Sequence, residues 1–386
     1  CLSTMHDIYK PMFSIDPKVT YLNHGSFGAC PKEVFNSLID FQRKLEFEPV
    51  KHLAHDIYQH LKESRSALSE YVNCHIDDIA FFPNPSTALN TLIRSLDITK
   101  GDQILTTNHE YGALDRTWRF ISKKRGCEYT KLDVAIPYTD KQLIIDSFKN
   151  AINKNTKVIF LSHITSATAL ILPIKEIIEL AKEHNILTII DGAHAPAQID
   201  LDIKNLDPDF YCGACHKWMC SPKGVAFLYV KKQYQDMLEP LVVSWGYEAE
   251  YPSDSQFLDY MQWQGTNDIS AYLTIPDTIK FLKKHDWKKK AQHCRALNLW
   301  AKNEICTALD TYATGDDQFL GQMTTIAFKL EEPLKEQIDF YTKYKIQLPF
   351  IKWNDKTFFR ISLQVYNSKE DINYLIKSLL QYRASK

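Results

Sequence analysis

Apolar runs of strand length alternate with amphipathic segments through the middle of this 386-residue chain. Residues 156–164 form one such run, and Pro173 then opens a segment in which apolar residues recur at the spacing of a helix face. Further apolar runs follow at 186–190 and 225–230. This alternation predicts an α/β fold in which helices cover both faces of a mostly parallel sheet.

Two ionisable residues stand directly after apolar runs. Asp191 ends the run at 186–190, and Lys217 lies just past a strand-like run at 209–212. The carboxyl ends of parallel strands share one edge of a sheet, and ligands bind at that edge. A carboxylate and an amine that meet there suit pyridoxal 5'-phosphate (PLP). The lysine can bind its aldehyde as a Schiff base, while the acid keeps the pyridine nitrogen protonated.

A predicted helix start offers a place for the phosphate group. Ser86 and Thr87 precede an apolar helical face that begins at Leu89. The free N–H groups and the dipole of a helix N-terminus favour anions, and two hydroxyls add donors there. Capping of the helix by Ser86 would give the same sequence pattern, so both interpretations stay open at this point.

The composition argues against several classes of partner. A net charge of -1 and the lack of a basic block argue against nucleic acid or an anionic membrane surface as a partner. No apolar run approaches the roughly 18 residues of a membrane span, and residues 1–16 have no apolar signal core. The nine scattered cysteines fit free thiols better than disulfides. We therefore expect a cytoplasmic protein.

Several short segments stand in a recognisable order along nearly the whole chain. They are YLNHGSFGACP (21–31), PNPSTALN (83–90), HEYGALDRTW (109–118), SHITSATALILP (162–173), DGAHA (191–195), CHKWMCSPKG (215–224), VVSWGYE (242–248), QGTND (264–268) and FRISLQVYN (359–367). With these segments the chain resembles the class V aminotransferase family of fold-type I PLP-dependent enzymes, and within it the isopenicillin N epimerase-like branch. Cysteine desulfurases and ergothioneine-type C–S lyases are related to that branch.

The resemblance implies a large PLP-binding domain and a smaller α+β domain. The large domain would hold a mostly parallel seven-stranded sheet between helices, and we expect it to span 31–275. We expect the small domain at 276–386. Residues 1–30 would form an N-terminal segment that contributes to the small domain and to the active site.

The resemblance also implies roles around the cofactor ring. Lys217 would carry PLP and act as the catalytic base, and Asp191 would bind the pyridine nitrogen. His194 would contact the ring hydroxyl, and Ser166 would lie beside the same oxygen. Tyr111 stands where relatives stack an aromatic or histidine ring on the pyridine. His109 is the alternative for this role if the loop is shifted by two residues.

Phosphate and substrate contacts follow from the same likeness. Ser86, Thr87 and His216 match phosphate ligands, and Thr266 matches a residue that reaches the phosphate of a partner subunit, which implies a homodimer with composite active sites. The substrate contacts would come from Arg360, Asn23 and His24. A guanidinium suits the α-carboxylate of an amino acid because it can donate two parallel hydrogen bonds.

The expected reaction is Schiff-base exchange at Lys217 followed by removal of the Cα proton of a small amino-acid substrate. Epimerisation is our first expectation, and a C–S lyase acting on an S-substituted cysteine or a cysteine sulfoxide is the alternative. An aminotransferase and a non-catalytic PLP-fold scaffold remain further alternatives. Cysteine desulfuration is disfavoured, because residues 331–359 contain no cysteine that could act as the nucleophile before Arg360.

Overall fold

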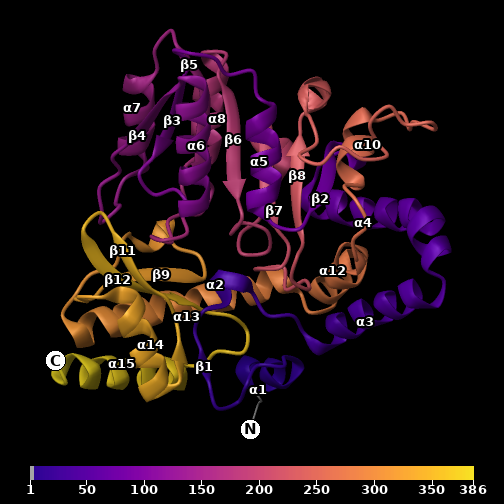
Figure 1. The fold of residues 1–386 in the computed structure, drawn as a ribbon. Coiled ribbons are helices and arrows are strands. Elements are labelled where there is room, and N and C mark those ends of the chain that lie inside the picture. Colours follow the sequence, from indigo (N-terminus) through magenta and orange to yellow (C-terminus); the bar gives the residue numbers. More distant parts are fainter. Residues whose placement is uncertain (1–3) are drawn as a thin grey trace.

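A seven-stranded sheet forms the centre of the larger part of the molecule in the computed structural model, which describes residues 4–386 (Figure 1). Its strands stand in the order β2 (Ile79–Phe82), β8 (Ala226–Val230), β7 (Phe210–Ala214), β6 (Leu187–Gly192), β5 (Thr156–Ser162), β3 (Gln103–Thr107) and β4 (Glu128–Leu132). β8 runs antiparallel to both of its neighbours, and the pairs from β7 to β4 are parallel. The predicted α/β class and mostly parallel sheet are confirmed.

Successive residues of the central strands enter two different cores. On β5, Val158 and Phe160 pack in one core, whereas Ile159 and Leu161 pack in the other. The first core is completed by α5 (Pro85–Ser95), α6 (Gly112–Arg125) and α10 (Gln256–Gln262). The second is completed by α4 (Ile57–Val72), α7 (Lys141–Ala151), α8 (Ile174–Glu183) and α12 (Ile275–Lys284). Each face of the sheet is therefore covered by helices.

A smaller α+β part follows in the sequence. Its antiparallel sheet has the order β11 (Phe350–Trp353), β12 (Lys356–Ser362) and β9 (Met323–Ala327). This part also contains α14 (Pro333–Tyr344) and α15 (Lys369–Ala384), and it shares α13 (Trp287–Leu309) with the larger part. The beginning of α13 packs in a core of the larger part, and its end packs in the core of the smaller part. The carboxyl end of β12 carries Arg360 toward the larger sheet.

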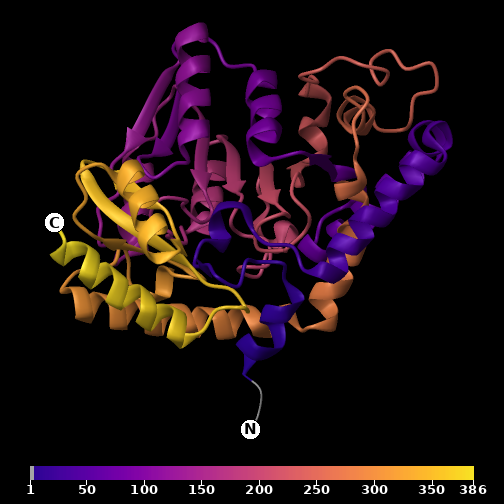
Figure 2. The same ribbon diagram turned by 60° about the horizontal axis from the view of Figure 1, so that its bottom comes forward.

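Both ends of the chain contribute to the smaller part. β1 (Thr20–Tyr21) pairs in parallel with β10 (Ile346–Gln347), and Figure 2 shows the N-terminal segment lying against the C-terminal region. Leu22 is fully buried in the core of the smaller part. The first three residues of the predicted N-terminal segment lie outside the described residues.

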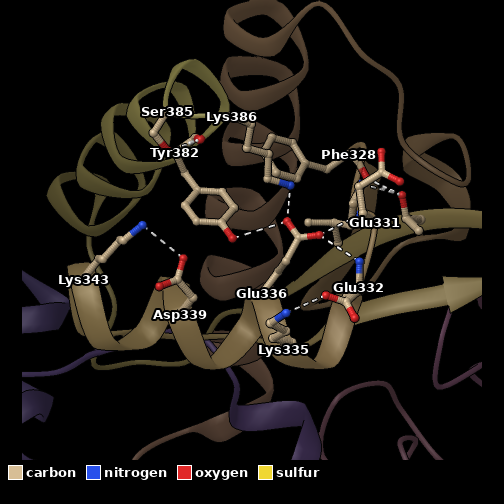
Figure 3. A network of polar contacts seen from close by, with 12 residues as sticks. Phe328, Glu331, Glu332, Lys335, Glu336, Asp339, Lys343, Tyr382, Ser385 and Lys386 are labelled. Carbon is tan, nitrogen blue, oxygen red and sulfur yellow. Dashed lines mark hydrogen bonds and ion pairs between the residues drawn. The ribbon is translucent and has the colours of Figure 1, made fainter.

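The last helix is fastened to α14 by polar contacts centred on Glu336 (Figure 3). One carboxylate oxygen of Glu336 accepts hydrogen bonds from the backbone N–H groups of Glu331 and Glu332, at 2.6 and 2.9 Å. The other oxygen accepts from Tyr382 at 3.3 Å and pairs with Lys386. We call these five residues the Glu336 network. The network provides acceptors for backbone N–H groups at the start of α14 and holds the C-terminal end of α15 against that helix.

None of the helices formed by residues 4–386 combines the length and the apolarity that a membrane span requires.

Candidate active site

A cavity of about 140 Å³ lies at the carboxyl ends of β5, β6 and β7. The sequence-predicted residues that line it are Ser86, Tyr111, Ser166, Asp191, His194, His216 and Lys217. A larger cavity of about 540 Å³ is lined mainly by apolar residues, with Lys223 among its few charged groups. The smaller cavity is therefore the candidate active site, because it gathers the groups that can do acid–base chemistry.

Lys217 lies in the turn that follows β7, and its Nζ is 3.4 Å from Nε2 of His194. The turn is held by Val225, whose carbonyl accepts hydrogen bonds from the N–H groups of Cys215 and His216 at 3.0 and 3.3 Å. Burial lowers the pKa of Lys217 to about 8, with the charge of Arg360 acting in the same direction and that of Asp191 against it. Roughly a tenth of this amine is uncharged at pH 7, far more than for an exposed lysine, and the uncharged form is the one that acts as a nucleophile or a base.

Asp191 ends β6 and is only 4% exposed. Within the described part of the chain, its side chain accepts one hydrogen bond, from the N–H of Ala193 at 3.1 Å. Burial raises the pKa of this carboxyl, while the Ala193 bond and the charge of Lys217 oppose the change. A buried carboxylate with so few partners favours a cationic N–H group beside it.

His194 is held in one tautomer by the neighbouring Trp218. The indole N–H of Trp218 donates to Nδ1 of His194 at 3.2 Å. An indole nitrogen can only donate, so Nδ1 is the acceptor and Nε2 carries the proton of the neutral ring. Burial, reinforced by the charges of Lys217 and Arg360, keeps the pKa of His194 well below its usual value. His194 therefore presents a fixed N–H donor on the Lys217 side of its ring.

The helix α5 is capped by Asn84 and not by Ser86. The N-cap is Asn84, whose side chain accepts from the N–H of Thr87 at 2.7 Å, and Pro85 opens the helix. The Ser86 hydroxyl is consequently not needed as a cap, and Ser86 lines the cavity. Thr87 does not line it, although it lies on the same first turn.

His216 borders the same end of the cavity. Its Nδ1 lies 2.9 Å from the carbonyl oxygen of Val225 and 3.2 Å from the N–H of that residue. Burial lowers the pKa of His216 to about 4, helped by the charge of Lys217. The ring is therefore neutral near neutral pH. In the tautomer in which Nδ1 accepts from Val225, Nε2 is free to donate to a bound anion.

Arg360 is 4% exposed, and its hydrogen bonds within residues 4–386 all go to neutral oxygens. Nη1 donates to the backbone oxygen of Ser166 at 2.7 Å, and Nη2 donates to Ser26 at 3.2 Å and to Asn23 at 3.4 Å. Nε has no partner in the described chain. Burial lowers the pKa of Arg360 to about 10, so the group is still charged at neutral pH. A buried cation without an anion calls for a carboxylate ligand.

The structure places two histidines away from the cavity. The ring of His24 is fully buried, with Nδ1 2.7 Å from the Tyr366 hydroxyl and Nε2 2.8 Å from the backbone oxygen of Lys217. His24 does not line the cavity and both of its ring nitrogens have partners in the described chain, while its expected contact with a substrate stays a prediction. His109 is likewise buried, with Thr168 and Val134 as partners at 2.7 Å each.

Tyr111 and Thr266 occupy different surroundings. Tyr111 lines the cavity and is 48% exposed, which leaves its ring available for stacking, whereas His109 is not. Thr266 lies outside the cavity of its own chain and lines a separate hollow with Trp245 and Trp263. The role of Thr266 toward a partner subunit stays a prediction.

Sequence reasoning missed Glu110. Its carboxyl accepts hydrogen bonds from the hydroxyls of Thr107 and Ser162, each at 2.7 Å. Burial raises the pKa of Glu110 to about 8, and the charge of Asp191 adds to the effect. Glu110 lies in the segment between β3 and α6 and does not line the cavity, and no motif in the sequence marked it.

These groups fit PLP. Asp191 and His194 offer the partners that a pyridine nitrogen and a ring hydroxyl need, and the first turn of α5 with His216 can receive a phosphate. Lys217 supplies the amine. Arg360 does not line the cavity, and its Nε has no partner in the described chain.

Comparison with known proteins agrees with the geometry. The model of the family "Aminotransferase class-V" matches residues 20–375. Isopenicillin N epimerase of Amycolatopsis lactamdurans is 27% identical over 96% of both chains, and that of Streptomyces clavuligerus is 32% identical over 69% of this chain and 70% of its own. Hercynylcysteine sulfoxide lyase of Schizosaccharomyces pombe is 25% identical over 97% of this chain and 96% of its own.

Solved structures show the same fold. A cysteine desulfurase from Thermococcus onnurineus NA1, in its apo form, has a TM-score of 0.84 at 18% identity and covers 100% of both chains. A mutant of C-DES with glycine covalently linked to the PLP cofactor has a TM-score of 0.84 at 20% identity, covering 94% of this chain and 96% of the other.

Proposed function

Because the chain belongs to the class V aminotransferase family of PLP-dependent enzymes, we propose that it binds PLP through Lys217 and epimerises an α-amino acid at Cα. One observation carries the proposal. The charges of a buried carboxylate, Asp191, and a buried guanidinium, Arg360, both act on the buried amine of Lys217, and the hydrogen bonds of Asp191 and Arg360 in the described chain are made with neutral groups only. Such a site is matched to a ligand that brings a cationic ring nitrogen and a carboxylate.

When bound, PLP supplies an electron-withdrawing ring that stabilises negative charge at Cα. Asp191 would hold the proton on the ring nitrogen, and His194 would donate from Nε2 to the ring oxygen. Arg360 would fix the substrate carboxylate with two N–H groups. Lys217 would then take the Cα proton at Nζ, because its lowered pKa leaves the amine partly uncharged at neutral pH.

Inversion at Cα needs a second proton donor on the opposite side from Lys217. Tyr111 is our candidate, since it lines the cavity and is 48% exposed. For this role its hydroxyl would have to lie on the side of the bound cofactor opposite Lys217. It could then return a proton from that side.

A C–S lyase is the second candidate, and the chemistry of the cavity supports it. β-Elimination from an S-substituted cysteine needs one base, and Lys217 can remove the proton and then protonate the departing sulfur. The relatives include hercynylcysteine sulfoxide lyase as well as probable L-cysteine desulfhydrases.

A panel of L-amino acids and S-substituted cysteines in deuterated water separates these activities. Epimerisation predicts deuterium at Cα and the appearance of the D-enantiomer without loss of substrate. Elimination predicts pyruvate, ammonia and a thiol, and transamination, with a keto acid added as amino-group acceptor, predicts the keto acid of the substrate. A protein that carries PLP but exchanges no Cα proton in any member of a broad panel would overturn the proposed function.

We further propose a cytoplasmic homodimer with composite active sites. The segment after β8 exposes Val243, Trp245 and Tyr251 at 65, 83 and 88%, and apolar surface of this extent is typical of an interface. Thr266 lies in the same surface region. Mixing inactive Lys217→Ala and Thr266→Ala subunits should restore activity, because one site of each mixed dimer then has no lesion. No recovery after demonstrated subunit exchange would place Thr266 outside the partner's site.

A further inference from the structure

The short helix α2 (His24–Phe27) lies between the strand that carries Arg360 and the turn that carries Lys217 (Figure 1). At its start, Asn23 forms a parallel bridge with Ser362 on β12, and the N–H of Ser362 donates to the carbonyl of Leu22 at 2.8 Å. The entry to α2 is therefore fixed to the strand of Arg360. The helix itself then reaches across to the larger part of the molecule.

On one side, α2 contacts the guanidinium of Arg360. Ser26 and Asn23 both accept from Nη2, at 3.2 and 3.4 Å, and the Ser26 hydroxyl also donates to Asn23 at 2.7 Å. These are long contacts to neutral groups. A substrate carboxylate at Arg360 would form shorter, charge-assisted bonds and would alter the contacts to Ser26 and Asn23.

On its other side, α2 holds the peptide of Lys217. The carbonyl of Lys217 can only accept, so Nε2 of His24 donates to it at 2.8 Å, and Nδ1 accepts from the hydroxyl of Tyr366 at 2.7 Å. Burial keeps this imidazole neutral, with its pKa lowered to about 3. The hydrogen bonds of His24 therefore do not change with pH in the neutral range.

The end of α2 packs equally closely on the same turn. Gly28 has a φ of +72°, and a Cβ atom at this position would lie 1.9 Å from the carbonyl oxygen of His216 and 2.9 Å from that of Lys217. Only glycine permits this approach. The hydrogen bond from His24 and the contact at Gly28 thus fix the backbone from which the Lys217 side chain extends.

We propose that α2 couples the carboxylate-binding Arg360 to the catalytic lysine, and that His24 is a positioning residue for Lys217. This inference rests on the roles of Lys217 and Arg360 in the proposed function. A lysine side chain has several rotatable bonds, so its amine is placed accurately only if its peptide is fixed. Because α2 contacts both groups, binding of a substrate carboxylate to Arg360 would change the position of the Lys217 peptide.

The test uses two substitutions at His24 and a matched control. His24→Phe removes both hydrogen bonds, whereas His24→Gln keeps a side-chain N–H for the Lys217 carbonyl and an oxygen for Tyr366. His285→Phe is the control, because His285 also contacts a tyrosine hydroxyl, that of Tyr9 at 3.1 Å, but lies outside the candidate active site. Each variant is compared in melting temperature and in bound PLP.

We expect His24→Phe to lower kcat for Cα-proton exchange about 100-fold with little change in KM, since a misplacement of about 1 Å has a cost of this order. His24→Gln should recover most of the rate, and His285→Phe should keep it. In the cofactor-free protein, amide hydrogen exchange of residues 215–224 should be faster in His24→Phe alone. An unchanged kcat, or unchanged amide exchange in His24→Phe, would overturn the positioning role.

The coupling itself is tested by combining His24→Phe with Arg360→Lys. If α2 links the two sites, the combined loss in kcat is smaller than the product of the single losses, because each substitution breaks the same connection. Losses that multiply would overturn the coupling. If the wild-type protein exchanges no Cα proton, the proposed function fails, while the amide exchange of the cofactor-free protein still decides whether His24 holds the Lys217 peptide.

Discussion

The molecule contains two polar clusters that each bring acidic and basic side chains together, and the pKa of the carboxyl group is lowered in one and raised in the other. In the Glu336 network, near the surface, burial alone would raise the pKa of Glu336, but Lys386 and the N–H groups of Glu332 and Glu331 outweigh it and the pKa is lowered (Figure 3). In the cavity beside Lys217, burial raises the pKa of Asp191 and lowers that of Lys217.

The difference lies in which partners each cluster already has. Both carboxylate oxygens of Glu336 have partners. Nearby, Nζ of Lys343 forms an ion pair with the carboxylate of Asp339 at 3.1 Å. Asp191 and Arg360 are buried, and their hydrogen bonds in the described chain are made with neutral groups only. A complete network supports the fold, whereas an incomplete buried one marks the place where a ligand supplies the missing charges.

The strongest test of this contrast is Lys217→Ala. We expect the variant to fold and to lose both the covalent bond to PLP and all Cα-proton exchange, because the attached amine and the base are the same atom. Borohydride reduction followed by mass spectrometry measures the bond. Lys223→Ala is the matched control on the same turn and should stay active. A borohydride-stable adduct in Lys217→Ala would assign the cofactor to another lysine.

Asp191→Asn keeps the shape of the side chain and removes its charge. We expect Cα-proton exchange to slow by several orders of magnitude, because the amide cannot hold a proton on the ring nitrogen. PLP affinity, measured by titration of the cofactor-free protein, should fall much less than the rate. Near-normal exchange in this variant would reduce Asp191 to the turn residue that its bond to Ala193 also permits.

A smaller effect concerns pH. Only the uncharged amine attacks the PLP aldehyde, and the pKa of Lys217 is lowered to about 8. The rate at which the cofactor-free protein forms its covalent bond to PLP should therefore rise about tenfold per pH unit below pH 8 and level off above it. Stopped-flow absorbance measures this rate. A rise that continues to the pH range of an exposed lysine would contradict the lowered pKa.

The smallest effect is expected for the complete network. Glu336→Gln should lower the free energy of unfolding by about 1 kcal/mol, because it weakens the ion pair with Lys386 and changes the acceptor at the start of α14. The urea midpoint measures this change. Activity should remain that of the wild type, and a loss of Cα-proton exchange in this variant would show that the two clusters are not independent.

The sequence predicted the central strands because apolar runs of strand length are a local signal. For the same reason Asp191 and Lys217 could be placed at a common edge of the sheet. An asparagine directly before a proline is also a local signal, and it marks Asn84 as the cap of α5.

The orientation of the His24 ring could not be predicted from the residues near it in the sequence. Its ring nitrogens bind the Lys217 carbonyl and the Tyr366 hydroxyl, which lie 193 and 342 residues further along the chain. A motif that places His24 in an active-site loop cannot tell whether its ring faces the substrate or the backbone behind it. Packing between distant segments decides that direction, as it also decides which of His109 and Tyr111 enters the cavity.

The pairing of Thr20–Tyr21 with Ile346–Gln347 has a consequence for the order in which a newly made chain matures. The strands that carry Asp191 and Lys217 leave the ribosome long before the strand of Arg360, and domains generally form as their residues emerge. The N-terminal loop with Asn23 can adopt its final position only after that strand has been made, because Asn23 pairs with Ser362 on it. The part of the site that contains Arg360 and Asn23 would therefore be completed last.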